Sequence, residues 1–304
     1  MSENLYQELI DRIKKSSLLA LPQSAVGFLE LTKDPSNGPP EYAKPISADP
    51  GLASQVLRFA NSSFFGFRYK ITTVQMALSL INVRTVKNFV LWNAVFALLP
   101  DPKYGPFDLK VFVLDSLRRG SFAKALGSCF SELDSEELFI AALLQDIAIP
   151  LLAQYWPNEY EKIAVRHQKS GLCLSVLEEE TFGWNHAIAG ALLVKEWGFA
   201  EELASNIEAH HTVGCQSRGT DKSRLEKKII RLSSLMPSCL EEEWMDSDNF
   251  FTAFARVPVQ GFTDVEVFKQ ADQLFSDLRA VMQLDQPTGT IISFHRQYLS
   301  SMSF

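Results

Sequence analysis

Apolar residues recur at helical spacing along nearly the whole chain. An early stripe contains Leu5, Leu9 and Ile13, and residues 86–99 are apolar on almost every face before the run stops at Pro100. Apolar positions three and four residues apart share one face of a helix, whereas the strict alternation typical of a half-buried strand is scarce. The pattern therefore predicts an all-α protein built as a helical bundle.

Breaks in this pattern divide the chain into three parts. Residues 101–108 carry Pro102, Gly105 and Pro106, and residues 213–220 carry Gly214 and Gly219, so both segments are predicted to be loops. We expect an amino-terminal helical part at 1–108, a helical core at 109–212 and a carboxy-terminal helical extension at 213–304. Five helices are expected between residues 109 and 209, with punctuation at Pro157, Gly171, Gly183 and Gly198.

Composition is that of an ordinary globular protein. The 304 residues include 29 Lys or Arg and 36 Asp or Glu, which gives a net charge of -7, and 46% of the residues are hydrophobic. A chain of this length buries roughly three quarters of its unfolded surface, so disorder is excluded for most of it, and two modules are expected. The acidic balance offers no general attraction for nucleic acid or an anionic membrane, and we expect neither as a partner.

Nothing in the chain predicts a membrane span or a signal peptide. The amino terminus is amphipathic with charges of both signs, and the most apolar stretches, 139–144 and 147–153, are interrupted by Gln145 and Asp146. We therefore expect a cytoplasmic protein.

One basic run could in principle track phosphates. Asp221 and Glu226 interrupt it, however, and three glutamates follow at 241–243. A solvated helix face is the favoured interpretation over a nucleic-acid surface. The basic residues of the run are Arg218, Lys222, Arg224, Lys227, Lys228 and Arg231.

Histidine gives the sharpest chemical signal. The chain has five, and His186, His210 and His211 fall within 26 residues of one another. A single histidine near a helix end is most often structural, but neutral imidazole is the commonest metal ligand and a site needs several together. His210 and His211 could serve one ion only where a helix ends, because neighbours within a helix point about 100° apart.

Asp146 is the second unusual residue, because it lies in the most apolar segment of the chain, 139–149. A carboxylate in such surroundings must be paired or metal-bound to stay charged. A metal ligand is as compatible with the sequence as a structural carboxylate, either exposed on one side at a helix end or paired with a lysine or arginine.

These residues resemble the HDOD domain, a bacterial relative of the HD metal-dependent phosphohydrolases. The resemblance covers about 18–212 and rests on short motifs at matching separations. It implies an all-helical protein with an HD-like core that works in bacterial signalling and regulation, generally without demonstrated catalysis. The matching motifs are Leu21-Pro22, 48–52, 56–62, 64–66, 71–80, 142–147, 178–180 with Gly183 and His186, 190–193 with Trp197, and 209–211.

Departures from the HD pattern concern one of two metal positions. Gln145 stands where HD enzymes place the histidine of their His-Asp doublet, Asp115 stands for the upstream histidine, and Ser233 or Ser234 stands for the final aspartate. By resemblance to the two-metal HD-GYP phosphodiesterases, the set for the first metal is eroded. The set for the second metal is complete and consists of Asp146, His186, His210 and His211.

The resemblance therefore implies one transition-metal ion, iron, manganese, nickel or zinc, held by three imidazoles and one carboxylate. Hydrolysis by two-metal enzymes needs both ions. We expect a non-catalytic signalling module that binds a partner protein or a small regulator, with a divergent metal-dependent phosphohydrolase or phosphodiesterase as the alternative.

Two further features have open interpretations. Asn61, Ser62 and Ser63 interrupt an apolar helix and either form a polar recognition spot or satisfy backbone groups at a turn, the favoured reading. Most of the 22 phenylalanines are expected in the core, and exposed ones in the carboxy-terminal helices could form a homodimer face.

Overall fold

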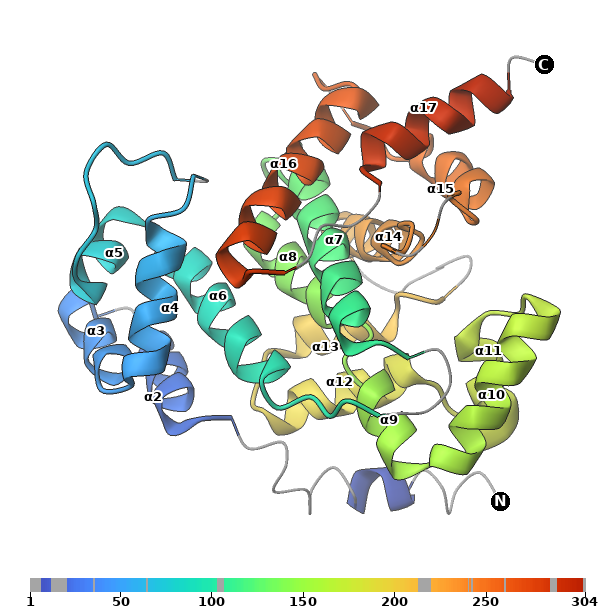
Figure 1. The fold of residues 1–304 in the computed structure, drawn as a ribbon, viewed down its shortest axis with the longest axis horizontal. Helices are drawn as coiled ribbons and strands as arrows, with labels where there is room; N and C mark the ends of the chain where they lie inside the picture. The colour runs from blue at the N-terminus through green and yellow to red at the C-terminus, as the bar shows by residue number, and fades with distance from the viewer. Residues whose placement is uncertain are drawn as a thin grey trace. The chain divides into compact units, whose positions relative to one another are not determined.

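A computed structural model of the 304-residue chain describes residues 7–11, 21–34, 36–63, 65–102, 107–212, 220–239, 241, 243–259, 261–284 and 289–302. Within these ranges the regular structure is helical and contains no strand, so the predicted all-α fold is confirmed (Figure 1). The helices of the amino-terminal region are α2 (Gln23–Leu31), α3 (Pro39–Ser47), α4 (Pro50–Ala60), α5 (Val74–Leu80) and α6 (Val83–Phe96). Those that follow are α7 (Leu109–Gly127), α8 (Ser135–Leu144), α9 (Ile149–Tyr155), α10 (Pro157–Ser170), α11 (Leu174–Phe182), α12 (His186–Glu196), α13 (Glu201–Glu208), α14 (Asp221–Ser234), α15 (Ser247–Phe254), α16 (Asp264–Met282) and α17 (Ile291–Ser301).

The chain divides into two compact units. One contains Pro100–Phe275 together with residues from the two ends of the chain, and the other contains Ser16–Leu99 and Ser276–Gln283. The three predicted domain ranges remain a prediction. Helix α14 packs against α7, α8 and α13, which places the beginning of the predicted extension in the same unit as the core.

The smaller unit is the bundle α2–α6, whose helices begin where local chemistry favours it. Asp49 caps α4 by accepting from Leu52 N–H at 3.0 Å, and Thr73 caps α5 by accepting from Met76 N–H at 3.1 Å, as predicted for Thr73. Rings of Phe59 and Phe89 stack at a centroid distance of 4.2 Å in its core.

Asn61 has a structural role in this unit. Its side-chain oxygen accepts from Ile71 N–H and its amide nitrogen donates to Ile71 O, both at 2.8 Å, which closes the loop between α4 and α5. The interpretation of Asn61 as a residue that satisfies backbone groups is therefore confirmed.

Between residues 109 and 209 the structure has seven helices, α7–α13, where the sequence predicts five. The four punctuated breaks are present. The two additional breaks, at 128–134 and 145–148, contain neither glycine nor proline, and the second follows the Gln145-Asp146 pair.

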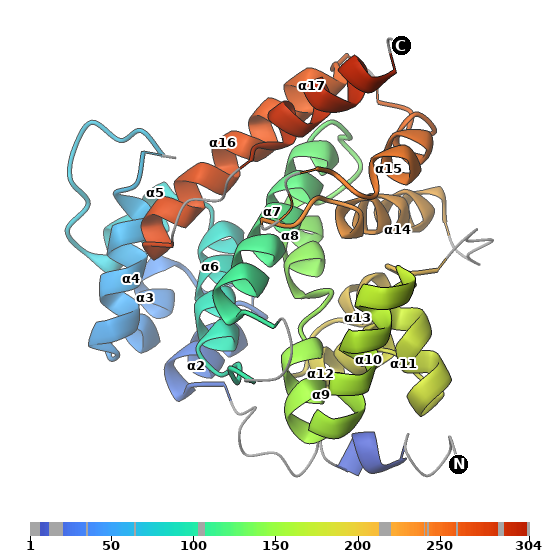
Figure 2. The same cartoon turned by 45° about the vertical axis from the view of Figure 1, so that its right-hand side comes forward.

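Helices α7 and α8 pack side by side along much of their length (Figures 1 and 2). Two glycines of α7 allow this approach. A Cβ atom at Gly120 would lie 3.1 Å from Phe139 O, and one at Gly127 would lie 2.4 Å from Leu138 Cδ1. The close packing of α7 on α8 brings the residues after Gln145 near the middle of α7.

Residues 135–155 form one stretch long and apolar enough to cross a bilayer by length and composition alone. Its most apolar window is 83% buried inside the protein, as expected for a core helix, so this signal is weak evidence for a membrane span. The stretch comprises α8, the break at 145–148 and α9.

The carboxy-terminal helices add an aromatic core. Phe250 and Phe268 are fully buried and contact Phe122 of α7, with Phe250 and Phe122 at a centroid distance of 5.5 Å. The prediction that phenylalanines such as Phe250 belong to the core is confirmed. Helical spacing of apolar residues also predicts helices over 223–240 and 241–257, and the observed α14 and α15 are shorter than these segments.

Candidate metal centre

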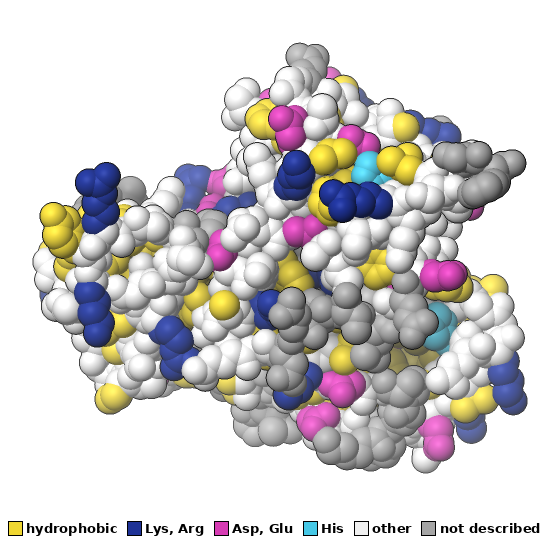
Figure 3. All heavy atoms as spheres, turned by 45° about the horizontal axis from the view of Figure 1, so that its top comes forward, with side chains coloured by type: hydrophobic (Ala, Val, Ile, Leu, Met, Phe, Trp, Pro, Cys, Tyr) yellow, Lys and Arg dark blue, Asp and Glu magenta, His cyan; other side chains and the backbone are white. Residues whose placement is uncertain are grey.

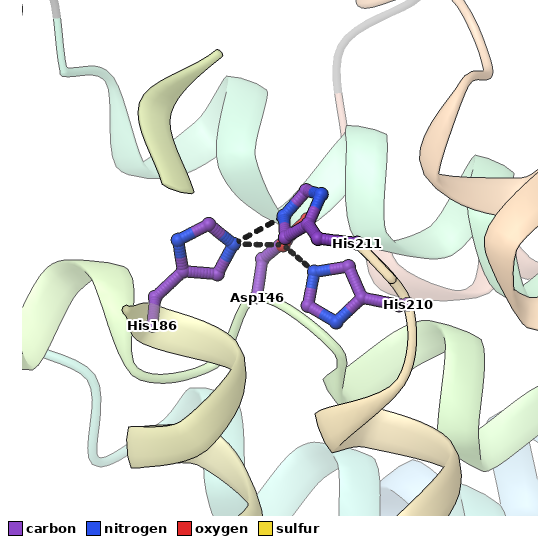
Figure 4. A group of neighbouring side chains, drawn as sticks. All are labelled: Asp146, His186, His210 and His211. Atoms are coloured by element: carbon purple, nitrogen blue, oxygen red, sulfur yellow. Dashed lines mark hydrogen bonds and ion pairs between the residues drawn. The ribbon is translucent and has the colours of Figure 1, made fainter. Parts of the chain in front are cut away.

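The four candidate ligands converge on one point in the larger unit (Figure 4). Asp146 Oδ1 lies 3.1 Å from His210 Nε2 and 3.2 Å from His186 Nε2, and His186 Nε2 lies 2.8 Å from His211 Nε2. One donor atom from each residue lies within 4.8 Å of the others. His210, His186 and Asp146 are buried and His211 is partly buried.

Helix ends position each of these side chains. Asp146 lies in the break between α8 and α9, where Ile149 N–H donates to Asp146 O at 2.9 Å. His186 is the first residue of α12, after Asn185 caps the helix by accepting from Ala187 N–H at 3.0 Å. Helix termini therefore bring together residues that lie 64 positions apart in the chain.

His210 and His211 follow the last turn of α13, which ends at Glu208. Because the helix has ended, these neighbouring imidazoles reach the same centre, with ring centroids 3.9 Å apart (Figure 4). His210 Nδ1 lies 2.6 Å from Ile207 O and donates to it, and His210 Nε2 faces Asp146. The sequence argument that both histidines could serve one ion at a helix end agrees with this geometry.

Glu178 orients His186. It is fully buried, and its Oε2 accepts from His186 N–H at 2.8 Å and lies 2.6 Å from His186 Nδ1. The Tyr160 hydroxyl donates to Glu178 Oε1. A carboxylate on Nδ1 fixes the tautomer whose Nε2 faces the centre, which is the usual arrangement around a metal-bound histidine.

In the sequence, Glu178 stands only within the family motif 178–180, with no predicted role of its own. The available signal is spacing: Leu174, Glu178 and Phe182 follow at intervals of four and share one face of α11. Phe182 is buried, so a carboxylate on that face needs partners.

Burial and neighbouring charges shift the pKa values of two histidines of the cluster. Burial lowers the pKa of His186, but the carboxylates of Glu178 and Asp146 outweigh it and raise that pKa to about 10. Burial, together with the neighbouring imidazoles of His210 and His186, lowers the pKa of His211 to about 2. The pKa values of these two imidazoles are therefore shifted in opposite directions.

Asp146 also has a cationic partner. Its Oδ2 lies 2.6 Å from Arg119 Nη1, on α7. Burial raises the pKa of Asp146, but the guanidinium and the hydrogen bonds from His186 and His210 hold it well below its usual range. Asp146 thus faces the imidazoles, as a metal ligand would, and is also paired with an arginine, as the structural interpretation allows.

The positions that resemble an eroded first-metal set are engaged elsewhere. Asp115 accepts from Ser238 Oγ and from Cys239 N–H, each at 2.7 Å. Gln145 Oε1 accepts from Ser233 Oγ at 3.0 Å, so Ser233, and not Ser234, faces Gln145. Ser234 Oγ donates instead to Arg231 O at 2.7 Å.

The donor set fits a transition-metal ion. Ligands at right angles around an ion, each about 2.1 Å away, lie about 3 Å from one another. Three of the donor–donor separations, 2.8, 3.1 and 3.2 Å, are close to that spacing, and all four donors lie within 4.8 Å of one another. Three imidazole nitrogens with one carboxylate oxygen suit such an ion. Metal binding by Asp146, His186, His210 and His211 nevertheless stays a prediction.

Comparison with known proteins shows the family. A sequence model described as the HDOD domain matches residues 18–213. The chain belongs to the HDOD family. The predicted resemblance is therefore confirmed. The match begins at residue 18, as predicted, and ends at 213, one residue beyond the predicted end at 212.

Solved structures share the HDOD fold at low sequence identity. An HDOD domain protein of unknown function from Geobacter sulfurreducens is 17% identical with a TM-score of 0.70, covering 93% of this chain and 98% of its own. A protein from Shewanella amazonensis SB2B, provisionally named a phosphohydrolase, is 20% identical with a TM-score of 0.69, covering 91% and 98%. A Marinobacter aquaeolei VT8 protein, provisionally named a signal transduction protein, is 18% identical with a TM-score of 0.68, covering 93% and 64%.

A curated relative, an uncharacterized protein of Treponema pallidum (strain Nichols), is 22% identical over 213 residues, which is 69% of this chain. The chain spans 40% of that relative's length. These comparisons support the fold, and the activity is a separate matter.

Proposed function

We propose that this chain is a non-catalytic regulatory HDOD module whose degenerate HD-type site holds a single transition-metal ion in a structural role. Asp146, His186, His210 and His211 would hold that ion, which would be iron, manganese, nickel or zinc. The ion would tie the break after α8 to the ends of α12 and α13.

The observation that supports this proposal most is that the side chains at the first-metal positions are hydrogen-bonded to other parts of the protein. Asp115 caps the segment at Ser238 and Cys239, and Gln145 bonds Ser233, so neither offers a free anionic or imidazole ligand for a second ion. Two-metal hydrolysis needs one ion to activate water and another to hold the leaving oxygen. One complete ligand set supports ion binding without that chemistry.

Metal analysis tests the first half of the proposal. Protein purified without chelators is expected to contain about one ion per chain, and His186→Ala, which removes one ligand, is expected to contain much less. The matched control is His167→Ala, because His167 is exposed and lies outside the cluster. The absence of bound metal from the unmodified protein after supply of each of the four metals would overturn the proposal.

The runner-up function is a divergent phosphohydrolase or phosphodiesterase that works with one ion. It is favoured by the Shewanella amazonensis relative with the same fold, whose provisional name is phosphohydrolase. A screen of cyclic dinucleotides, nucleotides and simple phosphoesters with added manganese or iron separates the two. Turnover that Asp146→Ala abolishes would establish the enzyme and refute the regulatory module.

We further propose that the protein is cytoplasmic and that its partner is a signalling protein or a small regulator. A homodimer is a further proposal for the same chain. The name of the Marinobacter aquaeolei relative supports a signalling role. Lys and Arg side chains are scattered over the face drawn in Figure 3, with Asp and Glu side chains among them, which supports a partner other than nucleic acid.

A further inference from the structure

The two oxygens of Asp146 face different kinds of partner. Oδ1 lies 3.1 and 3.2 Å from the imidazoles of His210 and His186, whereas Oδ2 lies 2.6 Å from the guanidinium of Arg119. Both side chains of the ion pair are largely buried, with 18% of Arg119 and 10% of Asp146 exposed. This carboxylate therefore bridges a potential metal position and a fixed cation.

The two consecutive arginines of α7 point in different directions, and only Arg119 points toward Asp146. Arg118 donates to Pro237 O at 2.8 Å and to Gly289 O at 2.7 Å, and its guanidinium lies over the ring of Phe275. Arg119 points toward the break after α8 instead. The two residues thus have separate tasks, and only Arg119 belongs to the cluster.

A bridging carboxylate in two-metal sites offers one oxygen to each ion, and the ions lie about 3.5–4 Å apart. A guanidinium at one of those oxygens supplies positive charge, has no lone pair to share and stays protonated. It satisfies the carboxylate while excluding a second cation by charge and by volume.

We propose that Arg119 is a built-in cation that takes the place of a second metal ion at Asp146 Oδ2 and restricts the cluster to one ion. This inference concerns the same cluster as the proposed function and deepens it. It assigns the ion count of the site to one residue on α7, outside the four ligands.

Gln145 supplies the means to test this assignment. It is buried next to Asp146, and its Nε2 has no hydrogen-bond partner among the described residues. Gln145 stands where HD enzymes place the histidine of their His-Asp doublet, so Gln145→His restores an imidazole at that position and offers a second ion a ligand without any change in the four predicted ones. Whether the guanidinium blocks that ion can then be measured.

The experiment counts Mn²⁺ ions in three variants. Gln145→His with Arg119 intact, Gln145→His/Arg119→Ala and Gln145→His/Arg119→Lys are saturated with Mn²⁺, and bound metal per chain is measured together with the electron paramagnetic resonance spectrum. The Arg119→Ala member is expected to hold one more ion than the Arg119-intact member, with a spectrum of two coupled Mn²⁺ ions. The Arg119→Lys member, which keeps the charge, is expected to match the intact one.

An equal ion count with and without the guanidinium would overturn the inference, and so would uptake of the extra ion while Arg119 is present. If Arg119→Ala fails to fold, Arg119→Met in the same background removes the charge, retains much of the aliphatic volume and is interpreted in the same way. Failure of the proposed function has a different signature, because wild type would then bind no ion, whereas the inference is judged by the difference between variants.

Discussion

At the scale of single residues, Glu178 is the residue that holds His186 in place within the cluster. It accepts from both the backbone N–H and the side chain of His186 and is fully buried. The Tyr160 hydroxyl donates to its other oxygen. A second carboxylate of this kind fixes the orientation of an imidazole and raises its strength as a ligand.

Glu178→Gln is expected to weaken metal binding by about 10- to 100-fold, because the amide can no longer act as an anionic acceptor for His186 Nδ1. Titration calorimetry with Mn²⁺ or Zn²⁺ measures the effect. Glu180→Gln is the matched control, since Glu180 lies on the same helix in an exposed pair with Arg166. Equal affinities for the two variants would show that Glu178 is only a packing residue.

The sequence is enough to predict the four candidate ligands but not the residues that support them. Histidine is rare in this chain and Asp146 interrupts an apolar segment, so their chemistry is conspicuous. Arg119 is one of two adjacent arginines, and no spacing shows which of them faces a carboxylate 27 residues away. Glu178 is one of three consecutive glutamates, and its spacing of four residues from Phe182 indicates a shared helix face but not the partners that it finds there.

At the scale of helices, the sequence predicts boundaries best where glycine, proline or a capping residue marks them. Gly171 and Gly183 adopt positive φ values of 68° and 82° at the ends of α10 and α11, as their punctuation suggests. The break after Leu144 contains no glycine, proline or capping side chain, and its one marker is Pro150 in the first turn of α9. A pattern that reads 139–153 as nearly continuous apolar sequence does not show where α8 ends.

Two helical glycines are expected to respond in opposite ways to alanine. Gly27→Ala is expected to stabilise the protein by up to about 1 kcal/mol, because alanine favours helices and the new Cβ would lie at an ordinary 3.5 Å from Pro45. Gly120→Ala is expected to destabilise it by about 1–3 kcal/mol, because Phe139 backbone and ring atoms lie within 3.2 Å of the new Cβ.

Urea unfolding measures both free energies of unfolding. Stabilisation by Gly120→Ala would mean that the two helices can move apart without loss.

At the scale of the whole molecule, the cluster and its supporting residues all belong to one compact unit. Arg119, Asp146, Tyr160, Glu178 and the three histidines lie within Pro100–Phe275, whereas Asn61 and the bundle α2–α6 belong to the other unit. The HDOD family match extends over parts of both. The effects of an ion on stability should therefore be distributed unevenly along the chain.

Metal loading is expected to stabilise the larger unit, because an ion that binds only the folded form adds about 4 kcal/mol at a free concentration a thousand times its Kd. Hydrogen exchange measured with metal and after chelation provides a test for each helix. Amides of α12 and α13, whose ends carry His186, His210 and His211, are expected to exchange more slowly with metal, and those of α3 and α4 at unchanged rates. His186→Ala should remove the difference, while equal slowing of all four helices would show that the ion acts on both units rather than on the one that holds it.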